Sequence, residues 1–121
     1  GLSLYSHHLK DGTNCKLENF CEMVAKTAEI MDVNNIGIGS DLCLNQPDNV
    51  VEWMRNGTWS KSTNYGEGSK KKPGFPKQPE WFLDARGFDN LETGLKKVGF
   101  NKQEVEGILG NNWFNFYKGI N

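Results

Sequence analysis

The sequence predicts an α/β fold in which one helix connects two parallel strands. Residues 1–5 (GLSLY) alternate along the chain in the way that a half-buried strand does. Apolar residues then recur at helical spacing from about 15 to 31, and a second short apolar run follows at 36–40 (IGIGS). Because short connections join strand, helix and strand, we expect a βαβ unit with parallel strands over residues 1–42.

Length and charge exclude several classes of protein. The chain has 121 residues, a size that suits one domain or a part of one. Its 14 basic and 15 acidic residues leave a net charge of −1, which offers no basic surface for nucleic acid or for an anionic membrane. No apolar run reaches the roughly 18 residues of a membrane span. We therefore expect neither nucleic acid nor a membrane span.

The cysteines favour a reducing compartment. There are three of them, Cys15, Cys21 and Cys43, and no two form a C-x-x-C pair. An odd number without that spacing argues against a disulfide framework, so we expect a cytoplasmic location, with the periplasm as the alternative. Cys21 falls on the apolar stripe of the predicted helix and should be buried as a small apolar residue.

The predicted helix at 15–31 follows a loop, residues 6–14, that contains turn formers. Thr13 or Asn14 is the expected N-cap. One apolar face is built at spacings of three and four by Leu17, Phe20, Cys21, Val24, Ala28 and Met31. This face should be buried.

Residues 43–87 differ in composition and are predicted to form an insertion. They contain all 4 prolines and most of the tryptophans. A connection of this length in a compact domain is usually functional or disordered, and its aromatic residues favour an ordered excursion. Those residues are Trp53, Trp59, Tyr65, Phe75, Trp81 and Phe82. Asp48 is expected to cap a short helix, and the lysines of 69–72 to form a solvated tip.

The last part of the chain, residues 88–121, is predicted to be helical. Two helices each begin with a capping-box pair and end on a glycine: Asp89 with Glu92 and Gly99, then Asn101 with Glu104 and Gly110. A third short helix should start at Asn111 or Asn112, and its rings should close the domain.

The run IGIGSD, residues 36–41, puts an acid at the end of the second strand. Gly37, Gly39 and Asp41 share one strand face, and a face without side chains lets another group come close. Ligands of α/β folds bind at the carboxyl ends of parallel strands, where Asp41 should stand. A carboxylate there can hold an ammonium group or a metal, or act as a base. A turn or N-cap aspartate is the alternative.

Three blocks resemble the renal-type (membrane) dipeptidases and their bacterial relatives, in the order that the family has them. The blocks are GLSLYSHHL at 1–9, AEIMDVNNIGIGSDL at 28–42 and GLKKVGFNKQEVEGILGNNWFNFY at 94–117. The resemblance implies the C-terminal part of a metal-dependent (β/α)8 TIM barrel, with the long insertion of a bacterial branch. It also implies hydrolysis of dipeptides with two zinc ions whose ligands come from earlier barrel strands and are absent from this chain.

The resemblance also implies roles for a few residues. Asp41 matches the aspartate that holds the free amino group of the dipeptide and assists proton transfer. His8, or alternatively Tyr5 or His7, falls in the segment that contacts the carboxylate end of the substrate. The chain departs from the family's SDFDG block in the two positions after Leu42, which are Cys43 and Leu44 here, and this bears on the turn after the strand.

Two other functions remain open at this point. One is a non-enzymatic α/β module that binds a partner through the aromatic insertion. The other is a barrel hydrolase that acts on another amide or on a lactam. If the dipeptidase hypothesis holds, the 121 residues alone should carry neither zinc nor activity. Their two strands, each with an unpaired edge, should favour self-association or pairing with the rest of the barrel.

Overall fold

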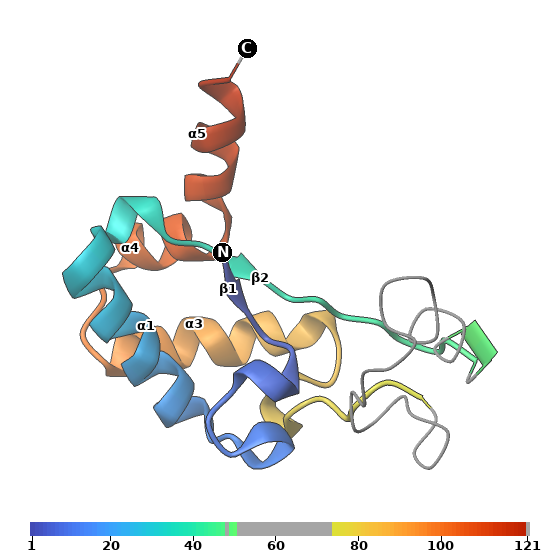
Figure 1. Ribbon diagram of the computed structural model, residues 1–121. Helices are drawn as coiled ribbons and strands as arrows, with labels where there is room; N and C mark the ends of the chain where they lie inside the picture. The colour runs from blue at the N-terminus through green and yellow to red at the C-terminus, as the bar shows by residue number, and fades with distance from the viewer. Residues whose placement is uncertain (48, 51–73, 121) are drawn as a thin grey trace. The chain divides into compact units, whose positions relative to one another are not determined.

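The computed structural model describes residues 1–47, 49–50 and 74–120 (Figure 1). These belong to two compact units, one made of Gly1–Asp41 and Gln78–Asn121 and the other of Leu42–Lys77. The first unit holds both strands and all the helices considered below. Several features predicted for the insertion lie outside the described residues: Asp48, Trp53, Trp59, Tyr65 and the lysines of 69–72.

The two short strands of the first unit pair in parallel, as the βαβ prediction requires. β1 is Leu2–Ser3 and β2 is Ile38–Gly39, with Leu2 opposite Ile38 and Ser3 opposite Gly39. The amide of Leu2 donates to the Gly37 carbonyl at 2.7 Å, and that of Leu4 donates to the Gly39 carbonyl at 3.1 Å. Both strands are shorter than predicted, and in β1 the chain enters a 3₁₀ turn at Ser6–His8 soon after the last paired residue.

The helix that connects the strands is α1, Leu17–Met31. Its predicted apolar face is buried in the first turns, where Phe20, Cys21 and Val24 are at most 1% exposed. The face does not stay buried to the end, since Met31 is 53% exposed. The prediction that Thr13 or Asn14 caps this helix is wrong. Both lie in a separate 3₁₀ turn, Gly12–Asn14, and the N-cap position is held by Lys16, which makes no side-chain capping bond.

Two further helices follow, α3 at Phe88–Lys97 and α4 at Lys102–Glu106. The predicted box at α4 is confirmed: the amide of Glu104 donates to Asn101 Oδ1 at 3.0 Å, and the amide of Asn101 donates to Glu104 Oε2 at 2.8 Å. The box predicted at Asp89 is wrong. The N-cap there is Gly87, and the Glu92 carboxylate instead pairs with the ammonium of Lys96 along the helix.

The two glycines predicted as stops behave differently. Gly99 ends α3 with a φ of 108°, and the next amide, that of Phe100, donates back to the Leu95 carbonyl at 3.2 Å. Gly110 does not end a helix. It lies in a π-helical turn, Gly107–Asn111, which leads straight into α5, Asn112–Lys118.

The core of the first unit lies where α1 and α3 pack together, with segments from both halves of the chain. Gly94 allows the close approach, because a Cβ atom there would lie 2.7 Å from Cys21 Sγ. From the predicted insertion, Trp81 and Phe82 join this core in a 3₁₀ turn at Glu80–Phe82, where Phe82 is fully buried and the Trp81 ring lies 5.4 Å from that of Phe20. The core has side chains at 0–1% exposure from Leu4, Phe20, Cys21, Val24, Phe82, Leu91, Leu95 and Ile108.

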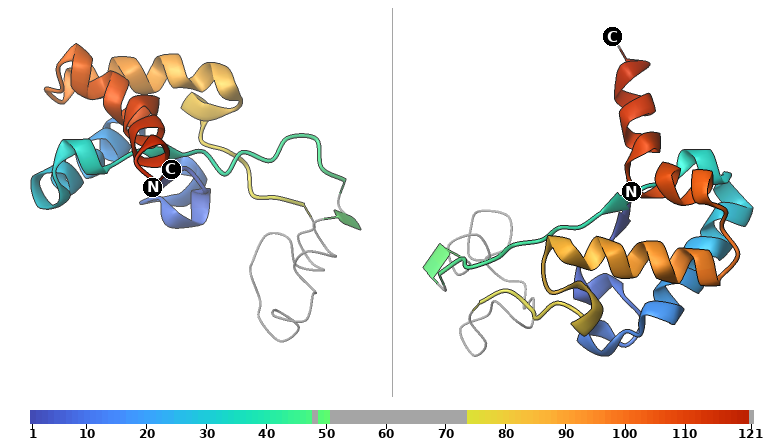
Figure 2. Two further views of the ribbon diagram at one scale, coloured as in Figure 1. Left: turned by 90° about the horizontal axis from the view of Figure 1, so that it is seen from above. Right: turned by 180° about the vertical axis from the view of Figure 1, so that it is seen from behind.

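The rings of α5 do not close the domain, contrary to expectation. The helix projects away from α1 and α3 (Figures 1 and 2). Phe114, Phe116 and Tyr117 are 66%, 58% and 62% exposed. Trp113 is the ring of this helix that turns inward, toward the two strands.

Candidate functional site

The predicted site residues follow the carboxyl ends of both strands. Tyr5 comes two residues after Ser3, the last paired residue of β1, and Asp41 comes two residues after Gly39, the last of β2. Because the strands are parallel, their carboxyl ends lie at the same end of the pair. The segment with Tyr5, His7 and His8 and the segment with Asp41 therefore both leave the pair at its carboxyl end.

Tyr5, His7 and His8 form a small aromatic cluster. The Tyr5 ring stacks on the His7 ring at 5.3 Å and meets the His8 ring edge-on at the same separation. The 3₁₀ turn is held by Ser6, which is 2% exposed and whose carbonyl accepts the amide of Leu9 at 3.1 Å. With Ser6 and Leu9 turned inward, both histidines remain exposed.

The carboxylate of Asp41 is exposed and its backbone is unusual. Its φ is 49°, in the left-handed region that most residues avoid and that aspartate and asparagine adopt more readily. Asp32 has a similar φ of 69°, but there the carboxylate accepts the amide of Asn34 at 2.9 Å, as a turn aspartate does. No such bond holds the Asp41 carboxylate in the part of the chain that the structure describes. The turn-aspartate alternative therefore fits Asp32 better than Asp41. Asp11 has a similar φ of 64° and its side chain also makes no capping bond, so the backbone conformation does not by itself mark Asp41 as functional.

The glycine face of β2 is only partly open. A Cβ atom on Gly37 would lie 2.5 Å from Nε1 of Trp113, so the indole of α5 is the group that comes close there. The other glycine, Gly39, is nearer to Asp41, and the nearest atom to a Cβ there is the Leu2 carbonyl oxygen at 4.0 Å. The expectation of a close-approaching group is thus confirmed at Gly37, where the group is a side chain of the protein itself.

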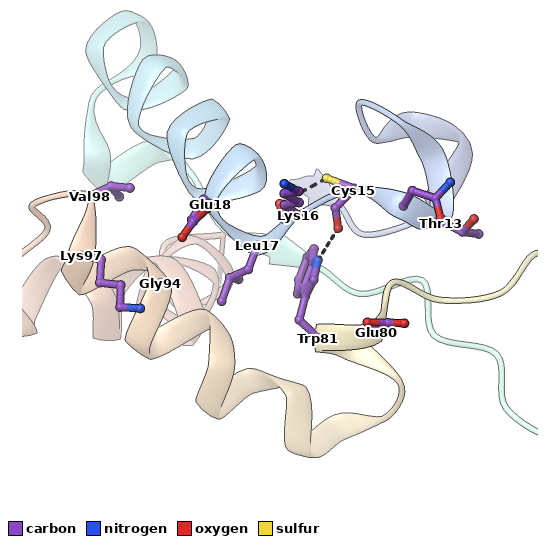
Figure 3. A pocket seen from close by; sticks show the side chains of 11 residues that line it. Thr13, Cys15, Lys16, Leu17, Glu18, Glu80, Trp81, Gly94, Lys97 and Val98 are labelled. Carbon is purple, nitrogen blue, oxygen red and sulfur yellow. Dashed lines mark hydrogen bonds between the residues drawn. The ribbon is translucent and has the colours of Figure 1, made fainter.

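Two hollows of similar volume lie elsewhere in this unit, besides a smaller one lined in part by Asn101 and Gly107, and none of the predicted site residues lines any of them. The first has a volume of about 520 Å³ and lies between the start of α1 and α3 (Figure 3). Its wall includes Trp81, whose indole Nε1–H donates to the Cys15 carbonyl at 2.7 Å. The second, of about 530 Å³, lies by the amino ends of the strands and is lined by Trp113, Phe116 and several asparagines. The sequence analysis predicted neither of the two larger hollows. Trp81 and Trp113, which line one hollow each, are the residues that could have indicated them.

The described residues do not form a metal centre. Within 1–47, 49–50 and 74–120, no three or more His, Cys, Asp and Glu side chains are grouped so that they could hold an ion. The described residues therefore supply no ligand set for the zinc that the family resemblance implies. No catalytic step through zinc can be assigned to them.

The cysteines are free thiols, and two of them are protected. Burial raises the pKa of Cys21 to about 11, with a further contribution from neighbouring Cys15. Burial, followed by the nearby Asp11 carboxylate, also raises the pKa of Cys15. Cys43 is only half-buried.

Thiol reactivity should be higher at the half-buried Cys43 than at the buried Cys21. At pH 8, only about one in a thousand Cys21 thiols should be ionised, and the thiolate is the reactive form. We expect iodoacetamide to label Cys43 at least about tenfold faster than Cys21 in the folded chain, as measured by mass spectrometry of peptides. In guanidinium chloride the rates should become similar. Equal rates in the folded protein would contradict the buried placement of Cys21.

None of the helices in the described segments is long and apolar enough to cross a membrane. No protein-family model matches the chain, and no curated protein or solved structure is significantly similar to it.

Proposed function

We propose that this chain supplies part of the substrate-binding face of a metal-dependent dipeptidase with a (β/α)8 barrel. The observation that carries the proposal is that Asp41 and the Tyr5–His8 segment follow the carboxyl ends of two paired parallel strands. In α/β barrels, substrates bind at the carboxyl ends of the strands. The three sequence blocks that resemble the renal-type dipeptidases add to this support and have the same order along the chain.

The small size of the sheet supports a larger parent fold. Parallel sheets are almost always covered on both faces and contain several strands. In the described residues, the sheet consists of β1 and β2 with two paired residues on each. A parallel pair this short would gain stability from further strands beside it, and a barrel would supply them.

Asp41 is proposed to bind the ammonium group of the dipeptide. Its carboxylate is exposed, and no side chain of the described segments neutralises it. A close ammonium–carboxylate pair that is partly removed from water contributes a few kcal/mol, and it selects substrates with a free amino end. The ring nitrogens of His7 and His8, held beside Tyr5, can donate hydrogen bonds to the other end of the substrate, its carboxylate. Zinc, the metal implied by the resemblance, would have to be bound by other residues of the parent protein.

The test is an assay of the complete coding sequence that contains this chain, purified with zinc. We expect it to hydrolyse dipeptides with a free amino group at least about a hundredfold more efficiently than the N-acetylated forms. Similar rates for both would favour the alternative amide or lactam substrate. An absence of hydrolysis in a zinc-loaded, folded protein would reject the peptidase.

The non-enzymatic alternative has one observation in its favour. The exposed rings of Phe114, Phe116 and Tyr117 on α5 form the kind of aromatic surface that partner proteins use. If the chain is a binding module, the complete protein should contain no zinc and hydrolyse no dipeptide.

A further inference from the structure

The outer edge of β2 is occupied by side chains of the chain's own C-terminal helix. The carbonyls of Gly37 and Gly39 face β1, since they accept amides from that strand. Carbonyls alternate along an extended chain, so those of Ile36 and Ile38 point to the opposite edge. Both are already bonded: Asn112 Nδ2 donates to the Ile36 carbonyl at 2.7 Å, and Trp113 Nε1 donates to the Ile38 carbonyl at 3.0 Å.

The fold makes specific room for these two side chains. At Gly37, a Cβ atom would collide with the Trp113 indole. At Gly107, in the π-helical turn before α5, a Cβ atom would lie 2.9 Å from Asn112 Oδ1. The second amide proton of Asn112 is also used, in a 2.8 Å bond to the Val33 carbonyl. Two glycine notches and three hydrogen bonds therefore fix Asn112 and Trp113 against this edge.

We propose that Asn112 and Trp113 form an edge guard, which keeps the outer edge of β2 closed against a second copy of this chain. An unguarded edge presents free carbonyls to any extended segment, and the same edge of another copy is the partner with matching geometry. The guard satisfies those carbonyls without adding a strand. A strand can pair at Ile38 only by displacing or sharing the indole N–H.

This inference goes beyond the proposed function and describes the 121-residue chain by itself. In the closed barrel of the proposed function, a further strand would lie along the same edge of β2 and would have to take the Ile38 carbonyl from Trp113. It also changes the expectation of self-association, because the edge of β2 that was expected to be free is covered in this structure.

The guard can be tested by self-association of the 121-residue chain. The double variant Asn112→Leu, Trp113→Phe removes all three hydrogen bonds. Leucine keeps the branched shape of asparagine, and phenylalanine keeps an aromatic ring, although a smaller one. We expect its association constant, measured by sedimentation at increasing concentration, to exceed that of the wild type by at least about tenfold. An unchanged association constant in the folded variant would overturn the proposal.

A matched control removes the same kinds of bond away from the edge. Asn90→Leu removes an amide that donates to the Trp81 carbonyl at 2.8 Å, and Trp81→Phe removes the indole bond to Cys15. This double variant should associate as the wild type does, and equal association of the two double variants would also reject the guard. If the guard variant does not fold, Trp113→Phe alone against Trp81→Phe makes the same comparison.

Discussion

Asp41→Asn is expected to lower kcat/KM for a free-amine dipeptide by at least about a hundredfold in the complete enzyme. The substitution keeps the shape of the side chain and removes the charge that would attract the substrate ammonium. A hundredfold loss corresponds to roughly 3 kcal/mol of transition-state stabilisation, which suits a partly desolvated ion pair. Steady-state kinetics give the ratio, and metal analysis should show unchanged zinc.

Asp32→Asn is the matched control for this experiment. It makes the same isosteric change at another aspartate with positive φ, but at the amino end of the strand, where the carboxylate holds a turn through the amide of Asn34. An asparagine can accept that bond, so kcat/KM should stay within about threefold of the wild type. Near-normal turnover of Asp41→Asn, or an equal loss in both variants, would remove Asp41 from the proposed site.

Local patterns predicted much of the fold of the first unit. The apolar spacing of Phe20, Cys21 and Val24 located the buried face of α1, because residues three and four apart share one side of a helix. The capping box of Asn101 and Glu104 could be predicted for a similar reason, since both of its hydrogen bonds join residues three apart in the sequence. The position of Asp41 relative to β1 also followed from a short-range rule, the parallel pairing of a βαβ unit.

Contacts between distant segments were not predictable in this way. Gly37 was expected to let another group come close, but nothing in the sequence identified that group as Trp113, a residue from the other end of the chain. Gly110 has the identity of a helix stop, yet the chain continues helically into α5, where Asn112 is bonded to the Val33 and Ile36 carbonyls. In both cases the contacts join segments that are far apart in the sequence, and a single sequence gives no sign of the partner.

The largest expected loss of stability comes from a residue of the predicted insertion. Phe82→Ala should lower the free energy of unfolding by about 3–5 kcal/mol, because the ring is fully buried and the cavity would remain partly empty. The ring meets that of Phe88 edge-on at 5.2 Å, and it closely approaches Gly87, where a Cβ atom would lie 2.6 Å from its Cδ2. Urea unfolding followed by circular dichroism measures the change.

Phe114→Ala provides the comparison, since it removes the same ring from a site that is 66% exposed on α5. It should change the free energy of unfolding by no more than about 0.5 kcal/mol. If the two substitutions cost the same, or if Phe114→Ala costs more, the core would not be centred on Phe82 and the rings of α5 would pack in solution. A large difference would show that Phe82 is part of the core that supports the two strands, whereas the projecting rings are dispensable for folding.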